Sequence, residues 1–165
     1  MKIDRVIVGD LCTNCYILSI DNKCLIIDPG DEYKKIEEVI DGKDIIGVII
    51  THHHFDHVGA LKYFDKKLLL DISNLEEKEY NIGNFNFEVI YTPGHKEDAI
   101  TIYFKKENIM FTGDFIFKGT IGRMDLPGGN YKDMQNSLNK IKKYDKNIKI
   151  YPGHGEETLL KNEID

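Results

Sequence analysis

Short apolar runs recur along almost the whole of this 165-residue chain, and they limit the folds open to it. The runs are four to seven residues long, rich in Ile and Val and bounded by Gly, Pro, Asp or Asn, a pattern typical of buried strands. We expect strands at 3–8, 15–20, 24–27, 45–50, 67–70, 85–91, 100–104, 108–111 and 148–151. The pair Asp21-Asn22 predicts a tight hairpin turn between two of them.

Segments with helical spacing of apolar residues lie between these runs. The spacing is carried by Tyr33, Ile36, Val39 and Ile40, by Val58, Leu61 and Phe64, and by Met134, Leu138 and Ile141; a short last helix is expected from Thr158. Strands interleaved with amphipathic helices predict sheets covered by helices, in the α/β or α+β class. The length suits one domain over 1–165, since a chain of this size buries roughly 68 to 70% of its unfolded surface.

Composition indicates which cellular compartment and which kinds of partner to expect. No apolar run approaches the roughly 18 residues of a membrane span, and the start lacks the features of a secretory signal, so we expect a cytoplasmic protein without a membrane partner. The 22 basic and 28 acidic residues give a net charge of −6, which disfavours nucleic acid and leaves a small molecule as the expected partner. Three cysteines, Cys12, Cys15 and Cys24, suit packing better than disulfides or a redox pair.

All four prolines are followed by glycine. The pairs are Pro29-Gly30, Pro93-Gly94, Pro127-Gly128 and Pro152-Gly153. Proline sets φ near −65° and glycine accepts positive φ, so each pair predicts a tight turn that re-aims the next side chain. That next residue is twice a histidine, His95 and His154.

The six histidines all lie at the ends of expected strands or just beyond them. Four of them fall within the segment 51–57, THHHFDH. Imidazole and carboxylate are the usual ligands of zinc and related divalent ions. Because regular strand alternation would point Asp56 and His57 in opposite directions, we expect an irregular loop that can fold around a metal.

The candidate ligands divide into two sets. We expect His52, His54 and His95 at one site, Asp56, His57 and His154 at a second, and Asp114 bridging both. The alternative is a histidine-rich loop that stores metal without a built site. The positions of His95, Asp114 and His154 at corresponding strand ends favour the built site.

The segment 52–57 resembles the HxHxDH motif of the metallo-β-lactamase superfamily. His95, Asp114 and His154 match the remaining ligand positions of that family in order, and the likeness runs from Asn14-Cys15-Tyr16 to the C-terminus. The resemblance implies an α+β fold, a four-layer αββα sandwich with the metals at one edge between two sheets. It also implies two divalent ions, with zinc expected first and iron or manganese as alternatives.

Within that superfamily the chain is similar to the short glyoxalase II-like branch, because Gly113-Asp114 is followed by IGRMDLPGG at 121–129. The resemblance implies hydrolysis of a thioester or related ester by a metal-bridging hydroxide, with Asp56 orienting the nucleophile and handling its proton. Hydrolysis of β-lactams is not expected, since true β-lactamases usually lack a bridging aspartate. The sequence ends eleven residues after His154, so the C-terminal glutathione-binding helical domain of full-length glyoxalase II is not expected.

Two further residues have alternative interpretations. Arg123 matches a basic position that helps to hold glutathione in glyoxalase II, and the alternative is a surface ion pair. Asp28, at a strand end before Pro29-Gly30, either orients a ligand histidine or caps a helix. His53 is not a ligand in the family pattern.

Two rival functions stay open at this stage. One is a persulfide dioxygenase, in which His52, His95 and Asp114 would hold a single Fe(II). The other is a non-catalytic metal-binding module, against which the surplus of ligands and the bridging position argue, because structural zinc sites close a four-ligand shell. Metal identity, physiological substrate and oligomeric state do not follow from the sequence.

Overall fold

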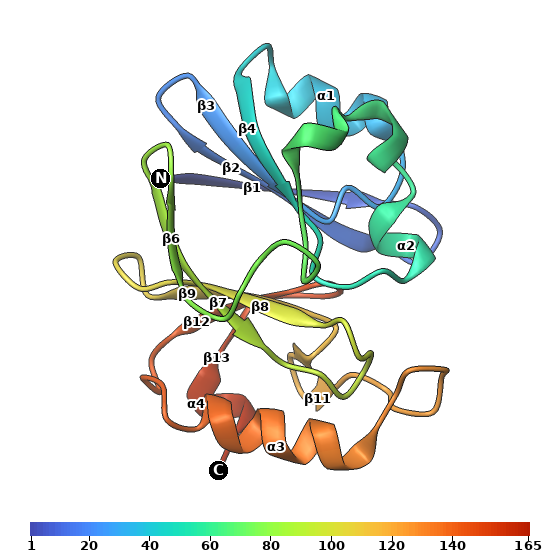
Figure 1. Cartoon of the computed structure of the whole chain (residues 1–165), viewed down its shortest axis with the longest axis vertical. Helices are drawn as coiled ribbons and strands as arrows, with labels where there is room; N and C mark the ends of the chain where they lie inside the picture. The colour runs from blue at the N-terminus through green and yellow to red at the C-terminus, as the bar shows by residue number, and fades with distance from the viewer.

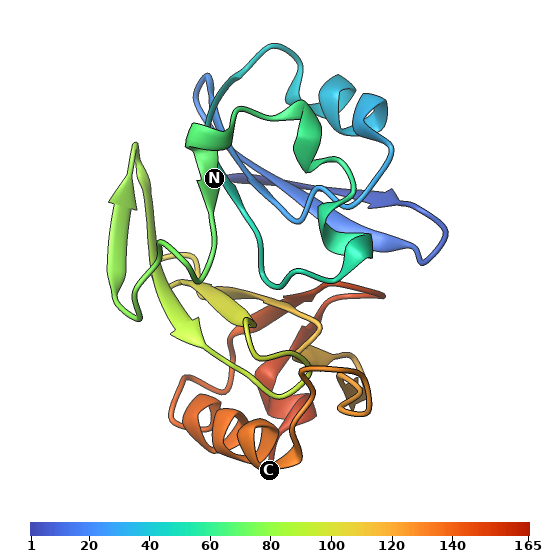
Figure 2. The same cartoon turned by 45° about the vertical axis from the view of Figure 1, so that its right-hand side comes forward.

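Two β-sheets lie face to face, and helices cover the outer face of each (Figure 1). The computed structural model describes all residues, 1–165. The layers run helix, sheet, sheet, helix, which confirms the predicted αββα sandwich and its α+β class. The turned view separates the two sheets and shows α3 (Tyr131–Ile141) and α4 (Leu160–Glu163) beneath the second one (Figure 2).

The first sheet has five strands in the order β1-β2-β3-β4-β5. Their bounds are β1 (Lys2–Val8), β2 (Thr13–Ile20), β3 (Lys23–Ile27), β4 (Asp44–Ile49) and β5 (Leu69–Leu70). The first three are antiparallel, and β4 and β5 continue the sheet in parallel. Helix α1 (Tyr33–Ile40) makes the crossover from β3 to β4, as a parallel pair requires.

The second sheet has six strands in the order β13-β12-β9-β8-β7-β6. Their bounds are β6 (Glu79–Ile82), β7 (Phe85–Tyr91), β8 (Ile100–Phe104), β9 (Ile109–Gly113), β12 (Lys149–Pro152) and β13 (Thr158–Leu159). Only β9 and β12 are parallel, and α3 lies between them in the chain. A small separate hairpin consists of β10 (Ile116–Phe117) and β11 (Thr120–Ile121).

Strand alternation divides the core into three clusters. On β2, Tyr16 and Leu18 point into the cluster between the sheets, whereas Cys15 and Ile17 point to the cluster beneath α1. The third cluster lies between the second sheet and α3 and includes Met134. Strands buried on both faces read as continuous apolar runs rather than alternating ones, which is why they stand out in the sequence.

Several elements differ from the sequence-based prediction. The helix expected through Val58, Leu61 and Phe64 is broken into α2 (Phe55–Val58) and a 3-10 turn at Leu61–Tyr63. The first half of the strand expected at 67–70 belongs to another 3-10 turn, at Lys66–Leu68, and the second half is the two-residue strand β5. Strands β6, β10, β11 and β13 were not predicted, and the last helix begins at Leu160 rather than Thr158.

The turn prediction for the Pro-Gly pairs holds in part. Gly94 and Gly128 have positive φ, at 147° and 87°, whereas Gly30 and Gly153 do not. The three cysteines are unpaired. Cys15 and Cys24 are buried in the core as predicted, whereas Cys12 is exposed, so the packing role expected for it is wrong. None of the helices combines the length and the apolar character needed to cross a membrane.

Candidate metal centre

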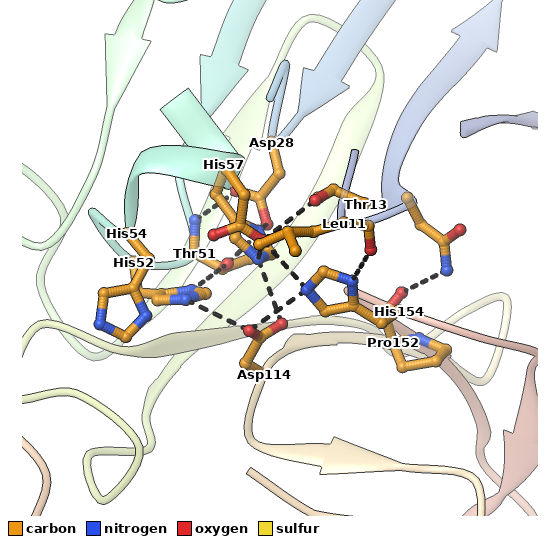
Figure 3. A network of polar contacts seen from close by, with 12 residues as sticks. Leu11, Thr13, Asp28, Thr51, His52, His54, His57, Asp114, Pro152 and His154 are labelled. Carbon is orange, nitrogen blue, oxygen red and sulfur yellow. Dashed lines mark hydrogen bonds and ion pairs between the residues drawn. The ribbon is translucent and has the colours of Figure 1, made fainter. Parts of the chain in front are cut away.

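The seven predicted ligands meet at one edge of the sandwich, where strands of both sheets end. Figure 3 shows five of them, His52, His54, His57, Asp114 and His154. His52 and His54 lie on the loop that follows β4, and Asp56 and His57 lie on the first turn of α2. His95, Asp114 and His154 come shortly after β7, β9 and β12. Three ligands therefore come from strand ends of the second sheet and lie beside the histidine loop of the first sheet.

One set of donor atoms consists of His52, His54, His95 and Asp114. Nε2 of His52 lies 3.6 Å from Oδ2 of Asp114, and Nε2 of His95 lies 3.4 Å from the same oxygen. Nδ1 of His54 lies 3.0 Å from Nε2 of His95. His54 thus faces the cluster through Nδ1, and the other histidines face it through Nε2.

The other set consists of Asp56, His57, Asp114 and His154. Nε2 of His57 lies 3.2 Å from Oδ1 of Asp114 and 3.4 Å from Oδ2 of Asp56. Nε2 of His154 lies 3.1 Å from Oδ2 of Asp56 and 3.4 Å from Oδ2 of Asp114. Asp114 belongs to both sets, as the sequence analysis expected for a bridging residue.

The arrangement fits metal ions. Nε2 of His52, Nε2 of His57 and Oδ1 of Asp114 are buried without a hydrogen-bond partner, which is costly unless a cation lies beside them. Four tetrahedral ligands at about 2.0 to 2.2 Å from zinc stand about 3.3 to 3.6 Å apart. The neighbouring donor pairs described above are 3.0 to 3.6 Å apart, and all donor atoms of each set lie within 4.8 Å of one another. The chemistry of the donors, imidazole and carboxylate, is that of zinc, iron and manganese sites.

Hydrogen bonds at the outer ring nitrogens orient four of the histidines. Nδ1 of His57 donates to Asp28 at 2.8 Å, and Nδ1 of His52 lies 3.1 Å from the hydroxyl of Thr51. Nδ1 of His95 donates to the carbonyl of Arg123 at 2.7 Å, and Nδ1 of His154 to that of Leu11 at 3.0 Å. A proton on Nδ1 leaves the Nε2 lone pair free for a cation, the usual tautomer of a metal-binding histidine.

Asp28 is the centre of a small buried network. Its carboxylate accepts hydrogen bonds from the backbone N–H of Thr51 at 2.8 Å, from the Thr51 hydroxyl at 2.6 Å and from His57. The alternative of helix capping is wrong, because the residue at the start of α1 is Glu32 and no side chain caps that helix. Of the two interpretations of Asp28, the structure supports the contact with a candidate ligand.

The start of β2 supplies contacts that the sequence analysis missed. Thr13 donates from its hydroxyl to Oδ2 of Asp56 at 3.0 Å. The Asn14 amide donates to the carbonyls of Pro152 and Gly155 at 3.0 and 2.9 Å, and the Tyr16 hydroxyl donates to Pro152 at 2.6 Å. These bonds tie the first sheet to the loop that carries His154. Only the polar Thr13-Asn14 pair at the start of an apolar strand could have drawn attention to them.

Two glycines are required by close approach at the cluster. A Cβ atom at Gly153 would lie 2.4 Å from Oδ1 of Asp114 and 2.8 Å from Cε1 of His57. A Cβ atom at Gly122 would lie 1.8 Å from the carbonyl oxygen of Asp114. Gly153 therefore serves the packing of the ligands rather than a positive φ, which is the physical reason that the turn interpretation failed there.

The charges of the cluster are strongly coupled. Burial alone would raise the pKa of Asp56, but contacts with His154, His57 and Thr13 lower it to about 2. Burial alone would lower the pKa of His154, yet Asp114 and Asp56 raise it to about 10. Burial and the neighbouring His57 hold the pKa of His52 well below its usual range. Burial alone would also lower the pKa of His57, yet Asp28 and Asp114 raise it above its usual range. Metal binding at His57 and His154 would therefore be linked to the release of protons.

A pocket of about 470 Å³ opens over the cluster. It is lined by His54, Asp56, His95, Asp114 and His154 together with Leu11, Phe55, Lys96, Arg123, Leu126 and Pro127. The Arg123 guanidinium lines this pocket and also forms a two-point ion pair with Asp125 at 2.7 and 2.8 Å. His53 points elsewhere, with Nε2 at 2.7 Å from Asp71.

Two overlapping histidine and aspartate clusters at the edge of an αββα sandwich define a class of metal-dependent protein. This chain belongs to the metallo-β-lactamase superfamily, since the model of that family matches residues 8–69 and 66–154.

Relatives of known sequence support the assignment. The probable metallo-hydrolase YqgX of Bacillus subtilis (strain 168) is 33% identical, with 100% of this chain and 95% of that protein covered. The hydroxyacylglutathione hydrolase GloC of Haemophilus influenzae (strain ATCC 51907 / DSM 11121 / KW20 / Rd) is 28% identical, with 99% and 95% covered. The chain is thus similar to metallo-hydrolases over its full length.

Solved structures agree on the fold. The BLEG-1 B3 metallo-β-lactamase superposes with a TM-score of 0.89 at 27% identity, covering 98% of this chain and 95% of that one. The di-iron-bound form of TTHA1623 superposes with a TM-score of 0.85 at 28% identity, covering 96% of each chain.

Proposed function

We propose that this protein is a metal-dependent hydrolase that cleaves a thioester or related ester. The single observation that carries the proposal is the convergence of seven donor side chains into two sets that share Asp114. Structural metal sites close one four-ligand shell, whereas two sets beside an open pocket leave room for a substrate. The similarity to the hydroxyacylglutathione hydrolase GloC supports the thioester as the substrate class.

We assign His52, His54 and His95 to one ion, Asp56, His57 and His154 to a second, and Asp114 to both. When bound, two divalent ions would lower the pKa of water from about 15.7 to about 7 and offer positive charge to a developing oxyanion. The protein's own contribution is to set the protonation state of each donor side chain. The depressed pKa of Asp56 keeps its carboxylate charged at neutral pH.

Asp56 is the residue we propose to handle the proton. Asp56 lines the pocket, and the Thr13 hydroxyl donates to its Oδ2 at 3.0 Å, so this oxygen would be held in place relative to a water molecule that enters the pocket. Attack on the carbonyl requires the water to lose a proton, and a carboxylate beside it can accept that proton. A thiolate leaving group needs little protonation, which suits a site without a second acid.

Replacement of Asp56 by Asn tests this role. We expect kcat on S-lactoylglutathione to fall by about 10²- to 10⁴-fold, the usual contribution of a positioned base. The matched control is Asp44→Asn, because Asp44 is exposed at the opposite end of β4. Unchanged turnover in Asp56→Asn, with metal content preserved, would refute the assignment.

The class of reaction is tested by metal analysis together with a substrate panel. The panel contains S-lactoylglutathione, an acyl thioester, a carboxylate ester, a phosphodiester and, because a similar structure is described as a B3 metallo-β-lactamase, a β-lactam. Thioester cleavage with two ions per chain supports the proposal. Absence of turnover on every substrate would favour the non-catalytic metal-binding module.

An iron-dependent dioxygenase remains the second candidate. The observation that favours iron as the metal is that TTHA1623, at 28% identity, is described in a di-iron-bound form, and a dioxygenase would need iron at only one of the two positions. His52, His95 and Asp114 lie close enough to hold one iron, with donor distances of 3.6 and 3.4 Å to Asp114. Oxygen consumption with a persulfide, in protein containing one iron per chain, would establish this function instead of hydrolysis.

A further inference from the structure

Three of the protein's seven exposed large apolar residues surround one pocket. Leu11, Phe55 and Leu126 are 52%, 77% and 38% exposed, and all three line the pocket over the candidate metal centre. They come from three separate segments: the turn between β1 and β2, the start of α2, and the loop before α3. Single exposed apolar residues are ordinary, but their convergence beside reactive groups indicates a binding surface.

The two cations that line the same pocket are engaged with carboxylates. Nζ of Lys96 lies 3.3 Å from Asp98 and 3.5 Å from Glu97, and Arg123 is paired with Asp125. The Arg123 pair is exposed and adds little stability, whereas the Lys96 pair with Asp98 is largely shielded from solvent. Each pair places a negative charge beside the cation. A substrate with its own carboxylates would have to displace them.

We propose that the substrate carries an uncharged, apolar group next to its scissile carbonyl, and that Leu11, Phe55 and Leu126 bind this group. The inference rests on the proposed hydrolysis and adds the kind of substrate. In the reaction, water adds its oxygen to the carbonyl carbon, the bond from that carbon to sulfur breaks, and the proton lost by water passes to the thiolate or to solvent. The products are a carboxylic acid and a thiol.

Chain-length series test the proposal with the metal-loaded protein. One series keeps N-acetylcysteamine as the thiol and varies the acyl group from acetyl through butyryl to hexanoyl; the other keeps acetyl and varies an alkyl thiol from ethyl to hexyl. We expect kcat/KM to rise about two- to fourfold for each added methylene in one of the series, the effect of burying a methylene on an apolar surface. Equal values along both series would overturn the proposal.

Binding of the products gives a readout that does not depend on turnover. Straight-chain carboxylates from acetate to octanoate and thiols from ethanethiol to hexanethiol are titrated calorimetrically, and we expect Kd to fall with chain length in one of the two families. If Kd falls with chain length but no substrate is turned over, the proposed hydrolysis is wrong and the apolar site is supported. If substrates are turned over but neither Kd nor kcat/KM depends on chain length, the apolar site is wrong and the hydrolysis is supported.

Substitution of Leu126 tests whether the dependence of kcat/KM on chain length arises in this pocket. In Leu126→Asn we expect the gain per methylene to fall below about 1.5-fold, because one apolar wall is lost. The matched control is Ile7→Asn: Ile7 is 48% exposed on β1 and does not line the pocket, so the slope should be retained. Unchanged slopes in both Leu126→Asn and Leu11→Asn, in variants that unfold at the same temperature as the parent, would contradict the assignment.

Discussion

Oδ2 of Asp28 lies 2.8 Å from Nδ1 of His57, and both side chains are buried. Asp28 itself has a left-handed backbone, with φ of 54°, a conformation that residues other than glycine seldom adopt. The backbone N–H and hydroxyl of Thr51 hold the same carboxylate. Asp28 therefore orients the imidazole ring of His57, and Thr51 in turn holds the Asp28 carboxylate in place.

Asp28→Asn tests this positioning role. We expect the affinity for the ion assigned to the His57 set to fall by about 10- to 100-fold, the usual effect of losing the partner of a ligand histidine. The measurement is competition with a chelator of known affinity. Asp31→Asn removes an exposed carboxylate three residues further on and should bind metal like the parent. Equal affinities in the two variants would argue against any role of Asp28 at the metal centre.

The bonds from β2 to the loop of His154 predict a selective loss of metal. Asn14→Ala removes one of the two side-chain donors to the buried carbonyl of Pro152 and the amide bond to the carbonyl of Gly155, so we expect unfolding to require about 1 to 3 kcal/mol less and the ion held by His154 to be lost first on dialysis. Tyr16→Phe should show the same preference more weakly.

Tyr144→Phe provides the matched control for Tyr16→Phe. Tyr144 also donates a hydrogen bond, to Glu88 at 2.7 Å, but it packs with the cluster beneath the second sheet. We expect a comparable loss of stability with full metal content. Simultaneous loss of both ions in Asn14→Ala would contradict a local action of these bonds.

A methyl group at Gly153 should disturb the cluster directly. In Gly153→Ala the new Cβ would press on Asp114 and His57, so we expect metal content below that of the parent and a large loss of turnover. Gly42→Ala is the control, since Gly42 has positive φ of 73° but an open surrounding. That variant should lose about 1 kcal/mol of stability to backbone strain and keep its metal. Normal metal content in Gly153→Ala would show that the loop can move aside.

The buried thiol of Cys24 predicts a loss of stability at alkaline pH. Burial is the largest cause that raises its pKa from 9.0 to about 11, so the folded state favours the neutral thiol. The stabilisation is complete below pH 9 and disappears as the pH rises through 11, at up to about 1.4 kcal/mol per pH unit.

Urea unfolding at pH 8 and pH 10 of the parent and of Cys24→Ala measures this contribution. The difference in unfolding free energy between the two proteins should shrink as the pH rises. A constant difference would mean that the thiol does not titrate differently in the folded state.

Most of the strands could be predicted from the sequence. The run 100–104 matches β8 residue for residue because every residue of this strand is buried, so few polar side chains are admitted. The run 85–91 matches β7 because its buried and more exposed residues alternate at the start of the strand, the period-2 pattern of a strand with one buried face. The break in the helix after the histidine loop was missed because Val58, Leu61 and Phe64 have the spacing of one helix. A short α-helix followed by a 3-10 turn also turns these three side chains toward the same core cluster, so the spacing does not distinguish the two structures. Short strands such as β10 and β13 carry too few residues for any periodicity.

The candidate ligands were also found in the sequence, because histidine and aspartate at strand ends carry a chemical signal of their own. What surrounds them was not. Asn14 and Tyr16 donate hydrogen bonds to a backbone carbonyl some 140 positions away. Every residue has a backbone carbonyl, so the sequence does not indicate which one is the partner. The choice of Nδ1 rather than Nε2 at His54 likewise depends on how the loop enters α2, which spacing does not fix.

The count of metal ions per chain tests the central claim most directly. Protein purified without chelator and reconstituted with zinc is analysed for metal, alongside His95→Ala and His154→Ala. We expect two ions per chain in the parent and one in each variant, because the two histidines belong to different donor sets that share Asp114. One ion or none in the parent, or the loss of both ions in each single variant, would contradict the two-ion site.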